Sequence, residues 1–171
     1  PEVIEHKPSE AIEPNTMFKL SYGLFVLTAR DGDKDNGCII NTAAQLTSNP
    51  NRISIAVNKG NFTHDMIMKT GVFNVSILST DAPFDIFKYY GFQSGRDVNK
   101  FPGSGFPRSK NNLIFITGCT NAFISGKVIE MHDYGTHTLF VADVTEARVF
   151  NNVPSVTYAY YFANIKPKPA P

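Results

Sequence analysis

The stretch 121–150, NAFISGKVIEMHDYGTHTLFVADVTEARVF, decides the fold class. Its two halves are rich in Val, Ile, Phe and Thr, residues that favour strands, and the short segment YGT separates them. Two such runs joined by a short turn containing glycine predict a β-hairpin. We therefore expect antiparallel strands at 121–133 and 137–150, with the turn at 134–136.

A second hairpin is predicted near the start of the chain. The run MFKLSYGLFVLTAR (17–30) is rich in Phe, Leu, Val and Tyr and predicts a strand. DGDKDNG (31–37) supplies turn chemistry, because Gly32 and Gly37 can adopt positive φ. The short strand CIIN (38–41) would complete the hairpin.

The rest of the chain adds strands and two short helices. Three further strands are expected at 52–58, 72–78 and 157–163, the first two from their alternation of polar and apolar residues. One helix is expected at 63–71, capped by Thr63 and ended by Gly71. A second short helix is expected around 84–90. Strands that follow one another without long helices between them favour an antiparallel barrel over a doubly wound parallel sheet.

The chain has 171 residues, which fits a single domain spanning 1–171. An extended, proline-punctuated lead-in is expected at 1–15, and a Pro-rich tail at 164–171 that would suit a linker. The loop at 102–112 is rich in Gly, Ser and Pro, and a loop of this length in a compact domain is usually functional or mobile.

Composition and charge exclude several classes of protein. The formal net charge is +1 and no run of five basic residues occurs, so nucleic-acid binding has no electrostatic support. No apolar run is long enough for a membrane span. The two cysteines, Cys38 and Cys119, form no CxxC pair, and we expect reduced, mostly buried thiols and a cytoplasmic location. No pair of histidines has metal-site spacing, so no metal is expected.

Two polar clusters point to a ligand. Residues 41–48 combine small side chains with amides and hydroxyls, and residues 58–63 lead into a predicted helix N-terminus, which is an anion-binding element. A flavin needs small residues beside its flat ring, amides along its pyrimidine edge, and hydroxyl and N–H donors at its phosphate. Asn, Ser and Pro are also common in simple connections between strands, so the residues alone leave that alternative open.

Five motifs follow one another along the chain. They are GCIINTAAQLTSNP (37–50), ISIAVNKGNFTHDMI (53–67), GVFNVSIL (71–78), GFQSGRDVNKF (91–101) and GTHTLFVADV (135–144). Together and in this order, they resemble the flavin reductase-like, FMN-binding split-barrel family. The similarity runs from about Met17 to Ala163 and favours the branch that contains flavoredoxin, archaeal ferric reductase and the flavin domain of high-molecular-weight rubredoxin. The resemblance implies a Greek-key split barrel that is mainly β with a few short helices, a homodimer, bound FMN, and NADH or NADPH as co-substrate.

By position, the resemblance also implies a set of cofactor-binding residues. Residues near the ring and ribityl chain would be Asn41, Thr42, Ala43, Ala44, Gln45 and Thr47. Residues near the phosphate would be Asn58, Lys59, Asn61, Phe62 and Thr63. Residues of the variable loop beside the cofactor would be Phe92, Ser94 and Arg96. His137 matches the family's Gly-x-His position and is expected on the nicotinamide side as the catalytic residue, although a structural role is the alternative.

The expected reaction is transfer of a hydride from NAD(P)H to flavin N5, with electrons then passed to an acceptor. Backbone N–H groups of residues 43–45 would stabilise negative charge at the flavin N1/O2 edge. The chain lacks Gly-x-Gly-x-x-Gly, so the nicotinamide would bind on the flavin face. Acceptors in the family include free flavin, ferric iron, rubredoxin and a monooxygenase partner. Two alternatives remain: an FMN-binding electron carrier without enzymatic activity, and a cofactor-free barrel of the OB type.

Overall fold

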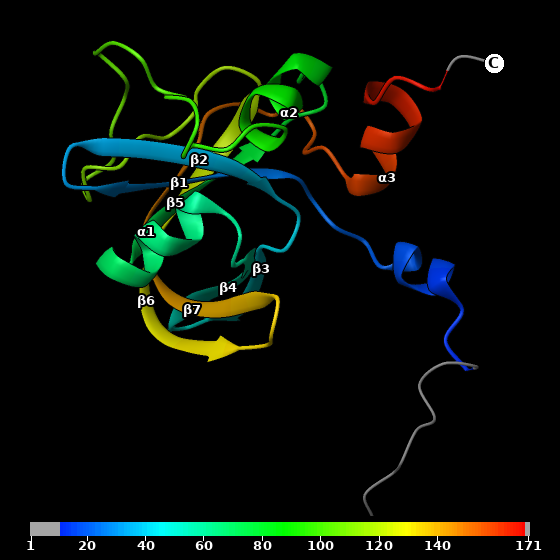
Figure 1. Cartoon of the computed structure of the whole chain (residues 1–171), viewed down its shortest axis with the longest axis horizontal. Helices are drawn as coiled ribbons and strands as arrows, with labels where there is room; N and C mark the ends of the chain where they lie inside the picture. The colour runs from blue at the N-terminus through cyan, green and yellow to red at the C-terminus, as the bar shows by residue number, and fades with distance from the viewer. Residues whose placement is uncertain (1–10, 170–171) are drawn as a thin grey trace, which may run out of the picture.

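A computed structural model describes residues 11–169. Seven strands form one sheet in the order β2-β1-β5-β6-β7-β4-β3, and every neighbouring pair is antiparallel. The sheet curls on itself (Figure 1), and apolar side chains fill its interior, which confirms the predicted mainly β split barrel. The strands are β1 (Phe25–Asp31), β2 (Lys34–Ile40), β3 (Ala44–Ser48), β4 (Asn51–Asn58), β5 (Val72–Leu78), β6 (Thr120–Asp133) and β7 (His137–Val149).

The helices are few and short. They are the 3-10 helix η1 (Pro14–Lys19), α1 (Phe62–Thr70), α2 (Phe84–Gly91), α3 (Tyr158–Tyr160) and the π-helical turn η2 (Tyr161–Ile165). Helix α1 ends at Gly71, as predicted, because this glycine adopts a φ of 72° and donates its N–H to the carbonyl of Ile67. The predicted cap at Thr63 is wrong, because Asn61 is the N-cap and Thr63 lies in the first turn. Within residues 11–169, no helix has the length and hydropathy needed to cross a membrane.

The hairpin of β6 and β7 lies within one residue of its predicted bounds. Register shifts at Ser125/Gly126 and Val128/Glu130 allow these long strands to bend around the barrel. Gly126 is required at the bend, because a Cβ there would lie 2.5 Å from the ring of Phe73. The β1–β2 hairpin is also confirmed, with Gly32 at a φ of 61° in a two-residue turn that is tighter than the predicted 31–37.

The predicted strand at 17–30 is wrong in its first half. Residues 14–19 form η1, which also replaces the end of the expected lead-in at 1–15; residues 1–10 of that lead-in lie outside the described part. Pro14 at the start of η1 fixes φ and favours a helical turn. The apolar side chains of Met17, Phe18 and Leu20 are all more than half exposed, so their hydrophobicity does not reflect a buried strand.

The polar cluster at 41–48 contains a strand that the sequence did not predict, because Ala44–Ser48 form β3. All five β3 residues are exposed, because β3 is an edge strand that pairs only with β4. Polar residues are typical of exposed edge strands. Because β3 therefore lacks the alternation of polar and apolar residues, its sequence does not predict a strand.

The predicted strand at 157–163 is also wrong. These residues form α3 and η2, which extend to Ile165 and include the start of the expected extended tail. Thr157 caps the turn by accepting a hydrogen bond from the Tyr160 N–H (3.0 Å). Aromatic residues predicted a strand here, but Tyr161 instead packs 4.6 Å from the ring of Phe87 in α2.

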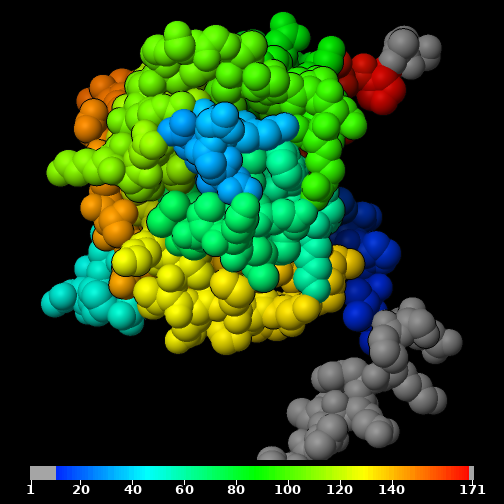
Figure 2. Space-filling model, turned by 60° about the vertical axis from the view of Figure 1, so that its left-hand side comes forward, coloured from blue at the N-terminus to red at the C-terminus, as the bar shows by residue number. Residues whose placement is uncertain are grey.

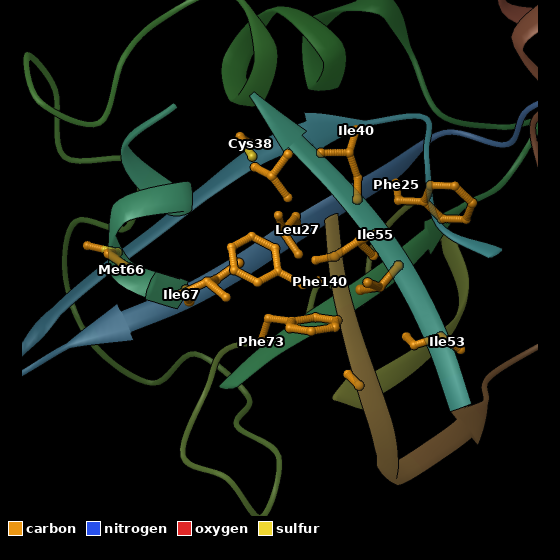
Figure 3. Packing of buried hydrophobic residues seen from close by; sticks show 14 residues of the cluster. Phe25, Leu27, Cys38, Ile40, Ile53, Ile55, Met66, Ile67, Phe73 and Phe140 are labelled. Carbon is orange, nitrogen blue, oxygen red and sulfur yellow. The ribbon is translucent and has the colours of Figure 1, made fainter. Parts of the chain in front are cut away.

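Two apolar cores hold the molecule together. The first fills the barrel and brings together side chains from β1, β4, β5, β7 and α1 (Figure 3), including the fully buried Leu27, Ile55, Ile67, Phe73 and Phe140. The second lies outside the barrel wall, where α2, the 101–116 loop and the C-terminal helical turns pack on β1. The first core therefore anchors α1, and the second anchors the end of α2.

Candidate functional site

The start of α1 and the end of α2 border a cleft of about 450 Å³. Its lining residues are Asn58, Gly60, Asn61, Phe62, Gly91, Phe92, Gln93 and Ser94. Asn58 shapes the turn between β4 and α1, since its Oδ1 accepts the N–H of Gly60 (2.8 Å) and its carbonyl accepts the N–H of Asn61 (3.0 Å). Helix α1 then begins at Phe62, and its first N–H groups lack helical partners.

A cation and an anion meet beside this helix start. Arg96 donates to Asp65, and its guanidinium carbon lies 4.8 Å from the centre of the Phe62 ring. A hydrogen bond with His64 and the Arg96 contact together hold the pKa of Asp65 below its usual value. Asp65 thus neutralises part of the positive charge of Arg96, whose side chain remains 48% exposed.

Buried polar residues fix the position of α1. Thr63 is fully buried, and its Oγ1 accepts a hydrogen bond from Asn36 Nδ2 (3.0 Å). His64 is also buried, with Nε2 2.8 Å from Thr138 Oγ1 and Nδ1 3.0 Å from Asp65. The side chain of Thr63 therefore supports the helix, while its backbone N–H remains part of the helix N-terminus.

Burial raises the pKa of the Cys38 thiol, which lies beside Thr63 and Asn61, to about 11. This placement agrees with a structural thiol inside the barrel. The sequence did not predict the supporting roles of Asn36 and His64. The polar residue Asn36, which lies just before the apolar run CII, could have indicated a buried hydrogen bond.

The predicted ring-binding residues lie at a second pocket. Ala43, Ala44 and Gln45 border a cavity of about 310 Å³. Apolar side chains of the barrel, including Phe25, Ile53, Val75, Ile77 and Ile124, form its floor. The structure therefore divides the predicted set between a polar cleft at α1 and an apolar cavity beside β3.

The two threonines of the first polar cluster form hydrogen bonds with the protein backbone. Thr42 Oγ1 donates to the carbonyl of Ala56 (2.6 Å) and accepts its N–H (3.2 Å), which attaches this segment to β4. Thr47 Oγ1 donates to the carbonyl of Pro50 (2.5 Å) at the β3–β4 turn. Asn41 precedes Thr42 and is half-buried. Thr42 and Thr47 thus use their hydroxyls within the protein.

Lys59 and His137 lie together at the turn of the β6–β7 hairpin. Lys59 Nζ is 2.6 Å from Asp133 Oδ1, and this contact keeps the pKa of Asp133 low. His137 is the register partner of Asn58, and its Nδ1 is 2.8 Å from Thr136 Oγ1. His137 is therefore next to the α1 cleft, although it does not line it.

The donors at the cleft fit a flavin phosphate. Amides from Asn58 and Asn61, a hydroxyl from Ser94 and the N–H groups at the start of α1 converge there. No carboxylate is among the eight described residues that line it. Phosphates bind at such helix N-termini, where N–H groups and the helix dipole both favour negative charge. The apolar cavity at β3 suits the flat ring.

Comparison with known proteins agrees with these features. The model of the flavin reductase like domain matches residues 17–168, so the chain belongs to the flavin reductase-like family. The high molecular weight rubredoxin of Moorella thermoacetica is 35% identical over 163 residues, which cover 94% of this chain and 71% of that protein. The ferric-chelate reductase (NAD(P)H) of Archaeoglobus fulgidus is 35% identical over 150 residues, covering 88% and 89%.

A solved structure shares the fold. The FMN-binding protein of Thermus thermophilus aligns with a TM-score of 0.72 at 21% identity, over 85% of this chain and 81% of that one. Family membership confirms the predicted class, an NAD(P)H:flavin oxidoreductase that uses a flavin and a nicotinamide co-substrate.

Proposed function

We propose that the chain holds FMN with its phosphate at the start of α1 and its ring beside β3. The observation that carries this proposal is the cleft itself, in which Asn58, Asn61 and Ser94 surround a helix N-terminus. Arg96, half exposed beside Phe62, adds positive charge. The backbone N–H groups of Phe62 and Thr63 complete the set of donors. The side chain of Thr63 can stay buried, because only its backbone N–H takes part.

The edge strand β3 suits the ring for two reasons. Ala43 and Ala44 have small side chains, so the backbone can approach a flat ligand. As β3 pairs on one side only, alternate N–H groups lie outside the sheet and can donate to the polar edge of the ring. Gln45 adds an amide at the same cavity.

The bound flavin would accept a hydride from NADH or NADPH at N5 and supply electrons to an acceptor. His137 lies beside Asn58 on β7, where its imidazole can orient a nicotinamide or hold a proton. Thr136 fixes the ring of His137 through Nδ1 (2.8 Å), which leaves Nε2 for the ligand.

Stopped-flow mixing of the FMN-loaded protein with NADH or NADPH, without oxygen, tests the proposed activity. Rapid loss of the flavin absorbance near the visible maximum would support an oxidoreductase. Reduction by a protein donor alone would instead identify an electron carrier without enzymatic activity. A colourless protein that takes up no FMN would contradict both.

The acceptor and the assembly are also proposals. The similarity to a high molecular weight rubredoxin favours rubredoxin or another small redox protein as electron acceptor, and the similarity to a ferric-chelate reductase favours ferric iron. We propose a homodimer in the cytoplasm, where reduced nicotinamide is available. Light scattering during gel filtration tests the dimer, and rates with each candidate acceptor test the electron route.

A further inference from the structure

A third pocket, which is polar, lies on the other side of the β1–β2 hairpin from the barrel interior. It measures about 590 Å³ and lies between the β1–β2 turn and the 99–108 loop. Figure 2 shows this turn, in light blue, between the yellow-green loop and α1. The lining residues are Arg30, Asp33, Lys34, Asp35, Asn99, Phe101, Gly103, Ser104, Gly105 and Arg108.

At this pocket, Arg30 shares the carboxylate of Asp35 with Arg108. Its Nε is buried and has no hydrogen-bond partner within residues 11–169. The distance from Arg30 Nε to Asp35 Oδ1 is 3.9 Å, which is too long for a hydrogen bond. Asp35 instead binds Arg108, whose Nη1 and Nη2 each lie 2.8 Å from a carboxylate oxygen. A bidentate pair of this kind satisfies Asp35 and leaves Arg30 without a strong acceptor.

The other residues of the pocket add charge and an accessible backbone. Lys34 contributes an ammonium group, whose Nζ donates to the carbonyl of Gly95 (3.0 Å) and lies 4.9 Å from the centre of the Phe62 ring, so it lies on the side of the pocket nearest the α1 cleft. Three cations and two carboxylates line the pocket, which gives a net charge of +1. Gly103 and Gly105 adopt φ values of 92° and 85°, which favour glycine, and residues 102–105 are exposed.

We propose that this pocket binds a small polyanion, a molecule bearing several phosphate or carboxylate groups, with Arg30 as its main ligand. A negatively charged group would give the partly buried guanidinium the acceptor that the protein does not provide. No residue lines both this pocket and the α1 cleft, and the two are neighbours, because Lys34 of the pocket contacts Phe62 of the cleft. The proposal therefore goes beyond the flavin site and does not depend on it.

The test is calorimetric titration of the full chain, saturated with FMN so that the α1 cleft cannot take up the probe. Two probes distinguish the sources of negative charge: tripolyphosphate represents phosphate-bearing ligands, and citrate represents carboxylate-bearing ones. Binding of either probe is expected, and Arg30→Gln should weaken it about tenfold, as the loss of a charge-assisted hydrogen bond does. Arg148→Gln removes the same charge from an arginine that pairs with Glu146 and should leave binding unchanged.

A second variant covers the possibility that Arg30→Gln alters the fold. Ser104→Glu places a carboxylate on the exposed rim and should also weaken binding, while the thermal midpoint stays at the wild-type value. Binding of neither probe at low salt would overturn the proposal. Equal loss of affinity in Arg30→Gln and Arg148→Gln would also overturn it, because it would indicate attraction by overall charge alone.

Discussion

Gly95 is the residue at which a single methyl group should disturb the packing that holds the start of α1 at the α1 cleft. A Cβ at this position would lie within 2.6 Å of three side-chain atoms of Asn36. Asn36 is only 1% exposed and donates to Thr63 at the start of α1, so it has little room to move. Gly95→Ala should therefore force Asn36 out of place and break its hydrogen bond to Thr63.

The expected cost of Gly95→Ala has two parts. Overpacking of a buried site costs about 1–3 kcal/mol, and a broken buried hydrogen bond costs about 1–3 kcal/mol. The free energy of unfolding should thus fall by roughly 2–6 kcal/mol, measured by urea denaturation. Gly118→Ala is the control, since a Cβ at Gly118 has no atom within 4 Å.

A double-mutant cycle tests the cause of this loss. Asn36→Ala removes the atoms that the new methyl group would meet, so Gly95→Ala in that background should cost under about 1 kcal/mol. The two substitutions should therefore be strongly non-additive. If Gly95→Ala leaves stability unchanged, or if its cost is the same with and without the Asn36 side chain, the reasoning is refuted.

Three further predictions concern acid stability, thiol reactivity and the barrel core. The lowered pKa of Asp65 contributes stability that is complete above its usual pKa of 3.8 and is lost as pH falls through the lowered value, so Asp65→Asn should reduce the melting temperature at pH 7, and this reduction should shrink as the pH falls below 3.8. With a pKa of about 11, Cys38 should resist iodoacetamide at pH 8 in the native protein and react after unfolding, as mass spectrometry of labelled peptides would show. Phe140→Ala should cost about 3–5 kcal/mol in chemical denaturation, whereas Phe18→Ala, at an exposed position, should cost little.

The sequence predicted those elements whose burial produces a clear pattern. In the sequence, the β6–β7 hairpin and the strands 52–58 and 72–78 are rich in apolar residues that alternate with polar ones, and their observed bounds differ from the predicted ones by one residue at most. The burial itself does not alternate strictly, because β4 buries three residues in a row and β5 buries four. Strand β3 has no such pattern, because both of its faces are exposed at the sheet edge. The C-terminal aromatic residues are typical of strands, but their helical form depends on packing against α2, which is a tertiary contact that local sequence does not contain.

The candidate site was predictable in its chemistry and only partly in its geometry. The two polar clusters of the sequence both border pockets, but these pockets are distinct. Which hydroxyls face a ligand depends on three-dimensional contacts: Thr42 and Thr47 bond to the backbone, and Thr63 is buried against Asn36. These roles follow from pairings of residues far apart in the chain, so composition could not reveal them.

The proposal that the start of α1 binds the flavin phosphate can be tested with one substitution and two ligands. Asn61 is the N-cap of α1, and Asn61→Asp retains a residue that favours helix starts while adding a negative charge at the phosphate position. Fluorescence titration should show that the wild-type protein binds FMN at least about tenfold more tightly than riboflavin. In Asn61→Asp this preference should disappear, while the affinity for riboflavin and the melting temperature stay the same. An FMN preference that persists in Asn61→Asp would contradict the proposed site.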